Sequence, residues 1–205
     1  MLKVLGRITS INVRKVAWAL DEMGVAYERE DWGKPNRDPN VPEFLGLNPN
    51  AQVPVIIDDG FVLWESHAIM RYLAREQRSG LWPADPKERA LVDQWMSWQS
   101  TELNPAWGYV RAALSKGLPN PDPVRVEESI RVWTKEMRIL EAQLHKTSGH
   151  VAGGAFSLAD IIMGLSTHRW MSMPFDKPVL PAVEAHYRQM QSRPAGKAYM
   201  GATTP

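Results

Sequence analysis

Glu65 and Ser66 stand where a short strand-like run of residues ends and a helical run begins. A helix N-terminus carries unpaired N–H groups and a partial positive charge, which suit a carboxylate. Ser66 adds a hydroxyl group to such a cradle, and the carboxylate of Glu65 suits a neighbouring ammonium group. Ser66 is also a typical N-cap residue. The two roles are compatible, because a cap that is exposed in a cleft is itself an anion site.

The Val53-Pro54 bond is the second feature that could form part of a binding site. An X-Pro bond is the one place where a cis peptide costs little. A cis bond here would turn the N–H and C=O groups of Val53 outward. A trans proline would simply begin the strand expected at residues 55–58. The residue types by themselves leave both possibilities open.

Any thiol chemistry of this chain must use the sulfur of a ligand, because the sequence contains no cysteine. That absence excludes disulfides, thiolate metal sites and a protein thiol nucleophile. The histidines lack the close spacing of a zinc or iron site, so no metal is expected. They are His67, His145, His150, His168 and His186.

Before residue 80, the elements that must position these residues alternate in type. Hydrophobic periodicity and turn residues predict a βαβ unit, a loop with one short helix, a hairpin with a turn at Asp59-Gly60, and a helix. The strands are expected at residues 2–6, 26–31, 55–58 and 61–64, and the helices at 12–23, 42–47 and 66–77. This part of the chain is therefore of α/β type.

After residue 86 every periodic segment is helical. The segment 80–86 reads as a linker between domains 1–79 and 87–205, because its prolines cannot continue a helix. Ser157 and Asp160 form an S-x-x-D pattern close to a capping box. Helices are expected at residues 87–116 (kinked at Pro105), 124–146, 158–171 and 182–191, the last closed by Ser192-Arg193-Pro194.

The composition is that of an ordinary globular protein, with 205 residues, 44% hydrophobic and 23% charged. A formal net charge of +1 gives no reason to expect nucleic acid or an acidic membrane surface as a partner. No apolar run resembles a signal peptide or a membrane span, so a cytoplasmic protein is expected. Most of the nine tryptophans are expected to fill cores.

Several motifs, in the same order and at the same distances, resemble the cytosolic glutathione transferases. The resemblance covers essentially the whole chain and implies a thioredoxin-like α/β N-terminal domain followed by an all-α domain. It also implies a homodimer, with glutathione as co-substrate and no metal. The motifs are Asn48-Pro49-Asn50-Ala51-Gln52-Val53-Pro54-Val55, Trp64-Glu65-Ser66-His67-Ala68-Ile69, Arg71-Tyr72-Leu73, the cap at Ser157 and Asp160, and Ser192-Arg193-Pro194-Ala195.

The resemblance assigns a part of glutathione to each predicted binding residue. The backbone of Val53, turned outward by a cis bond to Pro54, would pair with the cysteinyl unit. Ser66 would hold the γ-glutamyl carboxylate, and Glu65 the adjacent ammonium group. Gln52 stands where relatives often have lysine, so it can donate hydrogen bonds to the glycyl carboxylate but no charge. The cations nearest in sequence that could replace this charge are Lys34 and Arg37.

The reactive centre of such proteins lies at the first strand-to-helix turn, which here lacks both tyrosine and cysteine. Ser10 aligns with the serine of the theta- and delta-like classes, and Asn12 matches a bacterial group whose turn combines a hydroxyl with an asparagine. Lowering the pKa of a thiol by about two needs about 2.7 kcal/mol, which one donor and a helix end can supply. Alternatively, Ser10 is only the N-cap, and Asn12 or Thr9 holds the sulfur.

The second substrate would lie along the later half of the long helix. The residues on that side are Trp107, Val110, Arg111 and Leu114, which could equally be interdomain packing. The favoured activity is addition of glutathione to an electrophilic small molecule. Two alternatives stay open: reduction of disulfides or peroxides with two glutathiones, and a non-catalytic binding or assembly role.

Overall fold

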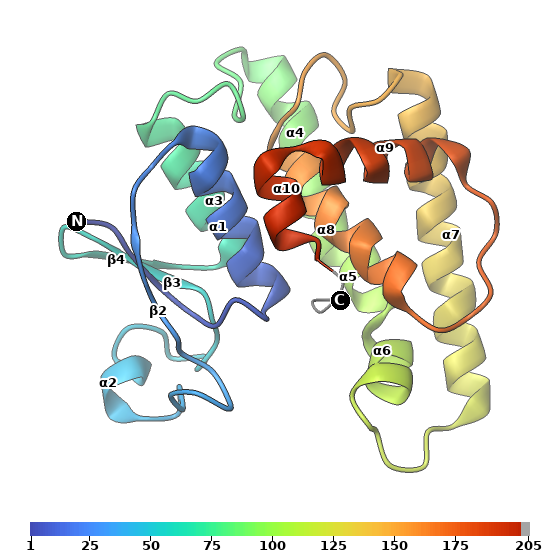
Figure 1. Ribbon diagram of the computed structural model, residues 1–205, viewed down its shortest axis with the longest axis horizontal. Helices are drawn as coiled ribbons and strands as arrows, with labels where there is room; N and C mark the ends of the chain where they lie inside the picture. The colour runs from blue at the N-terminus through green and yellow to red at the C-terminus, as the bar shows by residue number, and fades with distance from the viewer. Residues whose placement is uncertain (202–205) are drawn as a thin grey trace. The chain divides into compact units, whose positions relative to one another are not determined.

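The computed structural model describes residues 1–201 and divides the chain into two compact units (Figure 1). The first unit contains residues 1–82, and the second begins at Pro83. The division falls inside the segment 80–86 that the sequence marks as a linker. None of the helices within residues 1–201 is both long and apolar enough to cross a lipid bilayer.

The first unit is built on a four-stranded sheet of order β2-β1-β3-β4. Strand β2 is parallel to β1, while β3 is antiparallel to both β1 and β4. The β3–β4 turn takes positive φ at Asp59 and Gly60, as the Asp-Gly pair predicts. The strands are β1 (Lys3–Leu5), β2 (Glu28–Glu30), β3 (Val55–Asp58) and β4 (Phe61–Trp64).

Helices cover both faces of this sheet. Helices α1 (Ile11–Met23) and α3 (Ser66–Glu76) pack side by side on one face (Figure 1). The short helix α2 (Pro42–Leu45) contributes Phe44 to the other face. There Phe44, Leu5, Val55 and Trp32 form a buried cluster. The side-chain alternation of the strands thus separates two small cores, and the thioredoxin-like α/β prediction is confirmed.

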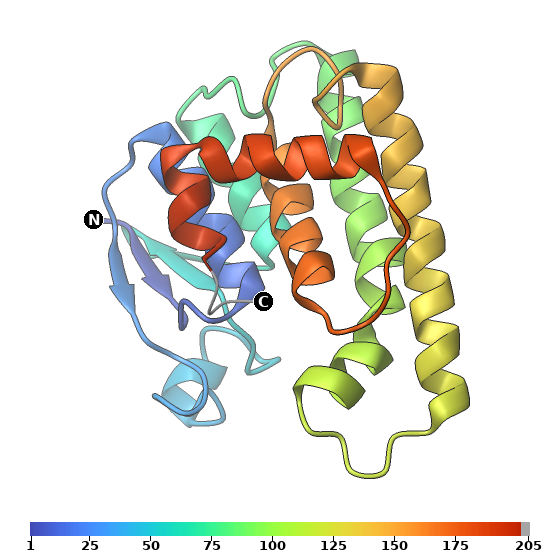
Figure 2. The ribbon, with the colours of Figure 1, turned by 45° about the vertical axis from the view of Figure 1, so that its right-hand side comes forward.

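The second unit is entirely helical within the described residues, as predicted. Its longest helix, α7, runs along one side of this unit (Figure 2). The elements are α4 (Pro86–Trp98), the π-helical η1 (Gln99–Leu103), α5 (Asn104–Ala106), α6 (Gly108–Ser115), α7 (Pro123–Thr147), α8 (Leu158–Ser172), α9 (Pro181–Ser192) and α10 (Pro194–Tyr199).

Helix α8 forms the centre of this unit. It packs against α4, α9 and α10, and its residues from Leu158 to Trp170 are all buried. Ser157 and Asp160 form the predicted capping box at its start. Three aromatic side chains, Trp133, Trp170 and Phe175, pack with ring centroids 5.0 to 5.8 Å apart. Six of the nine tryptophans are buried, which agrees with a core-filling role.

The structure corrects two expectations about the helical unit. The predicted helix 87–116 is interrupted: a π-helical turn precedes Pro105, and the chain bends again at Trp107. The ring of Pro105 would clash with the carbonyl of Thr101 in a regular α-helix, and the wider turn relieves this clash. Helix α9 ends at Ser192, as the Ser192-Arg193-Pro194 motif predicts, but it is not the last helix, because Pro194 is the first residue of α10.

Candidate functional site

Ser10 occupies the N-cap position of α1 but does not act as a cap through its side chain. Its backbone is extended, with φ −80° and ψ 125°, and its side chain accepts no hydrogen bond from the helix. The Ser10 carbonyl receives the N–H of Arg14 at 3.0 Å. Within the described residues the hydroxyl therefore remains available to a ligand beside the positive end of a 13-residue helix.

The two other candidates at this turn differ from Ser10 in exposure. Ser10 is half-buried, whereas Thr9 and Asn12 are exposed. The hydroxyl of Thr9 lies 3.4 Å from Nη1 of Arg7, which places it as an acceptor from that guanidinium group. A half-buried hydroxyl group is less screened by solvent than either exposed group, so its interaction with an anion is stronger.

The Val53-Pro54 peptide bond is cis, which confirms the arrangement favoured by the flanking motif. Within residues 1–201 no hydrogen bond uses the N–H or the carbonyl oxygen of Val53. The preceding loop is tied down by Asn48, a buried side chain whose Nδ2 donates to the carbonyl of Gln52 at 2.8 Å. The backbone of Val53 is thus both unpaired and held in place, as a strand-like contact with a peptide ligand requires.

Glu65 and Ser66 form the start of α3 with an unusual backbone. Glu65 is the N-cap residue with φ 72° and ψ 108°, and Ser66 is the first residue of the helix rather than its cap. No side chain caps this end. A non-glycine residue at positive φ is costly and persists where the surroundings impose it, which is typical of binding sites. The open N–H groups of the first turn suit an anion.

Buried basic groups lie behind the first turn of α3. Nζ of Lys15 lies 3.1 Å from Nε2 of His67, and both side chains are buried. Burial, together with the charges of Lys15 and Arg71, lowers the pKa of His67 to about 2. His67 is therefore neutral and accepts from the lysine, so the fixed positive charges here belong to Lys15 and Arg71.

A cavity of about 260 Å³ adjoins Gln52 and Val53 in the same unit. Its walls include Lys34, one of the two cations considered as a replacement for the missing lysine. The other, Arg37, stacks on the ring of Trp32 and pairs with Glu30 at 2.9 Å. The lining residues are Arg7, Gly33, Lys34, Pro39, Asn40, Ala51, Gln52 and Val53. Arg7 was not among the sequence-predicted residues, and only its charge at the end of β1 could have suggested it.

The residues predicted to contact a second substrate differ in accessibility. Trp107 and Val110 are buried, with the Trp107 ring 5.4 Å from that of Trp133 and the Val110 N–H bonded to Ser129 Oγ. Arg111 is half-buried, and 39% of Leu114 is exposed. The site remains a prediction, with Arg111 and Leu114 as its accessible members.

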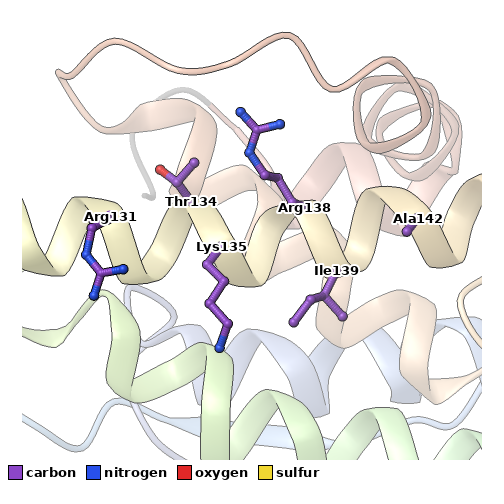
Figure 3. Close-up of a pocket in the computed structure, with 6 residues that line it drawn as sticks. All are labelled: Arg131, Thr134, Lys135, Arg138, Ile139 and Ala142. Carbon is purple, nitrogen blue, oxygen red and sulfur yellow. The ribbon is translucent and has the colours of Figure 1, made fainter.

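Two larger hollows lie in the helical unit, and no predicted glutathione-binding residue lines either of them. One of about 570 Å³ lies along the exposed face of α7 (Figure 3). The cations Arg131 and Lys135 on this face already pair with Glu128 and Glu136. The other, of about 460 Å³, lies between α7 and the η1–α6 region. Among residues 1–201 no cluster of side chains is suited to hold a metal ion.

Comparison with known proteins places this geometry in a family. Residues 1–75 match the model of the glutathione S-transferase N-terminal domain. The chain is 30% identical to glutathione S-transferase GstB of Escherichia coli K12 over 199 residues, which cover 95% of each protein. It therefore belongs to the glutathione transferase family.

Two further similarities bear on the class and the chemistry. A theta class glutathione S-transferase from Xanthomonas axonopodis pv. citri, solved with glutathione bound, is 33% identical with a TM-score of 0.91, covering 97% of this chain and 96% of that chain. Disulfide-bond oxidoreductase YfcG of Escherichia coli K12 is 32% identical over 203 residues, covering 93% of this chain and 91% of its own length. The first of these supports the predicted theta-like membership.

Proposed function

We propose that this protein is a glutathione transferase that stabilises the thiolate of glutathione for attack on an electrophilic small molecule. The observation that carries this mechanism is Ser10, whose hydroxyl stands at the start of α1 without serving as its cap. A free thiol has a pKa of about 8.5, so only a small fraction is ionised at neutral pH. Donation from Ser10, aided by the helix end, favours the anion without a proton relay.

The rest of the first unit would hold the tripeptide in position. The backbone of Val53 would pair with the cysteinyl unit, and Ser66 with the first turn of α3 would bind the γ-glutamyl carboxylate. The exposed carboxylate of Glu65 would receive the ammonium group. Holding the sulfur beside its electrophile removes much of the entropy cost of a bimolecular reaction.

The test of this proposal is the thiolate absorbance of bound glutathione in wild-type protein and in Ser10→Ala. The variant should bind glutathione but lose most of the thiolate signal at neutral pH. Asn12→Ala and Thr9→Ala serve as matched variants at the same turn. An unchanged signal in Ser10→Ala, with loss in either of the others, would transfer the role of donor to that residue.

Reduction of disulfides with two glutathiones is the second candidate, favoured by the similarity to YfcG, which is named a disulfide-bond oxidoreductase. The chain has no cysteine, so both sulfur atoms would come from glutathione. Turnover of a small dialkyl disulfide but not of an activated aryl halide would favour this activity. Binding of glutathione with neither reaction would favour the non-catalytic alternative.

A homodimer in the cytoplasm is the assembly and location proposed from family membership. Sedimentation analysis of the purified chain tests the dimer, and a monomer at micromolar concentration would contradict it.

A further inference from the structure

Four cationic side chains come from the turn after β1, from β2 and from the loop after β2, and two of them are paired with groups outside the cavity. Arg29 donates to the carbonyl of Gly6 at 3.0 Å and pairs with Asp31. Arg37 pairs with Glu30 and Glu43 and stacks on Trp32 at 3.8 Å. Neither lines the cavity. The cations that do line it are Arg7 and Lys34.

Arg7 is the better placed of these two. Among residues 1–201 no carboxylate forms an ion pair with Arg7, and its buried Nε has no hydrogen-bond partner. Lys34, by contrast, is 76% exposed along its side chain and lies 3.7 Å from Oδ2 of Asp38. An exposed lysine with a carboxylate already nearby offers an incoming anion less net attraction.

Gly33 makes room for the Arg7 side chain. Its φ is +101°, and a Cβ at this position would lie 3.1 Å from Nε and 3.2 Å from Cδ of Arg7. A larger residue would therefore be strained and would press the stem of Arg7 out of place. The cavity walls contain no acidic residue. The enclosure is consequently positive, and it continues directly into Gln52 and Val53.

We infer that Arg7 binds the glycyl carboxylate of glutathione and supplies the charge that Gln52 lacks. This inference rests on the function proposed above. A guanidinium group presents donors in a planar fork that matches a carboxylate, and such charge-assisted bonds are stronger than neutral ones. Gln52 adds a neutral amide donor from the same wall. Arg7 is thus a residue that determines specificity for a free carboxylate at this end of the ligand.

The experiment is a calorimetric comparison of two ligands: glutathione and its glycyl monoethyl ester, which is neutral at this end. Wild-type protein should bind glutathione about tenfold more tightly than the ester. Arg7→Met should lower the affinity for glutathione about tenfold and leave the affinity for the ester almost unchanged. The preference for the free acid should therefore disappear.

Three matched variants keep the result specific. Arg7→Lys retains the charge without the fork and should keep part of the preference. Lys34→Met should reduce the preference by no more than about threefold, because that side chain is largely exposed. Arg37→Met removes an arginine of the same loop that does not line the cavity, and the preference should persist.

Several outcomes would overturn the inference. Equal loss for both ligands in Arg7→Met would mean that Arg7 only shapes the cavity. Loss of preference in Lys34→Met but not in Arg7→Met would assign the carboxylate to Lys34. A wild-type protein that conjugates glutathione and its ester equally well would refute the inference while leaving the proposed function intact. Failure to bind either thiol would refute both.

Discussion

Helices α1 and α8 both begin after a serine, but the two serines are used differently. At α8, Ser157 and Asp160 complete a capping box, and Asp160 Oδ2 accepts from the backbone N–H and the hydroxyl of Ser157. At α1, the side chain of Ser10 accepts no hydrogen bond from the helix. We call the start of α8 at Ser157 closed, because side chains of the protein form its hydrogen bonds. We call the start of α1 at Ser10 open, because no side chain of the protein caps it.

The difference separates a structural helix start from a binding one. Asp160 is fully buried, and its Oδ1 also accepts from the N–H of Val151 and lies 3.1 Å from His186 Nε2. The first turn of α1 has no acidic residue, and α3 has no side-chain cap either. A helix start whose N–H groups are already satisfied inside the protein has nothing left for a ligand. The open starts of α1 and α3 are therefore the ones to which we assign binding.

The largest effect is expected at the closed helix start. Asp160→Asn removes a buried charge from a network of N–H, hydroxyl and imidazole donors, and one amide hydrogen must then face a donor. The free energy of unfolding should fall by about 3–5 kcal/mol, as for a broken buried polar network. Urea denaturation measures this change. A loss below about 1 kcal/mol would contradict the role assigned to the closed start.

The pH dependence of the free energy of unfolding provides an independent test of the role of Asp160. Burial acts to raise the pKa of Asp160, but the neighbouring His150 and the hydrogen bonds from His186 and the Val151 N–H together hold it below its usual value. A depressed carboxyl pKa contributes stability above the unfolded value, about 3.9, and that stability is lost as the pH falls further. The gap in stability between wild type and Asp160→Asn should therefore narrow below about pH 4.

The next effect belongs to an open helix start. Ser66→Ala removes the hydroxyl proposed to hold the γ-glutamyl carboxylate, so the Kd for glutathione should rise about tenfold. The free energy of unfolding should change by less than about 0.5 kcal/mol, because no side-chain cap bond is lost. Calorimetry and urea denaturation measure the two quantities. Loss of stability without loss of affinity would make Ser66 a structural residue.

A matched serine pair sharpens the comparison further. Ser157→Ala should lower the free energy of unfolding by about 1 kcal/mol, the usual value of an N-cap side chain. Ser10→Ala should lower it by less than about half of that. Both are measured in the same urea series. Equal losses would show that the Ser10 hydroxyl supports its helix after all.

Local signals in the sequence explain why most of the fold was predictable. Strands β3 and β4 have the predicted bounds, because alternating side chains and the Asp59-Gly60 turn define both ends. Helix α1 ends as expected at Gly24, which adopts the left-handed conformation. Pro194 correctly predicts the end of α9, but it gives no sign of α10, because proline is equally suited to a first helical position.

The candidate site was predictable only where the chemistry is local. The cis bond before Pro54 and the start of α3 at Ser66 follow from adjacent residues and the family motif. Arg7 could not be found in this way, because its role depends on the loop at Gly33, which approaches it only in the folded unit. The neutral state of His67 likewise depends on Lys15, which comes from another helix.

The smallest predicted effect concerns His150, which lies next to Asp160 at the closed start of α8. Nδ1 of His150 lies 3.5 Å from Asp160 Oδ1, and this contact raises the pKa of His150 despite partial burial. A raised histidine pKa contributes stability that is full below the unfolded value, about 6.5, and is lost as the pH rises through the folded value.

His150→Gln should therefore be less stable than wild type at about pH 5.5 and close to it at about pH 8. Urea denaturation at the two pH values measures this, with His145→Gln as control, because His145 is exposed on α7. A difference that does not depend on pH would show that His150 acts through packing, and the charge of Asp160 would then be balanced by its remaining donors alone.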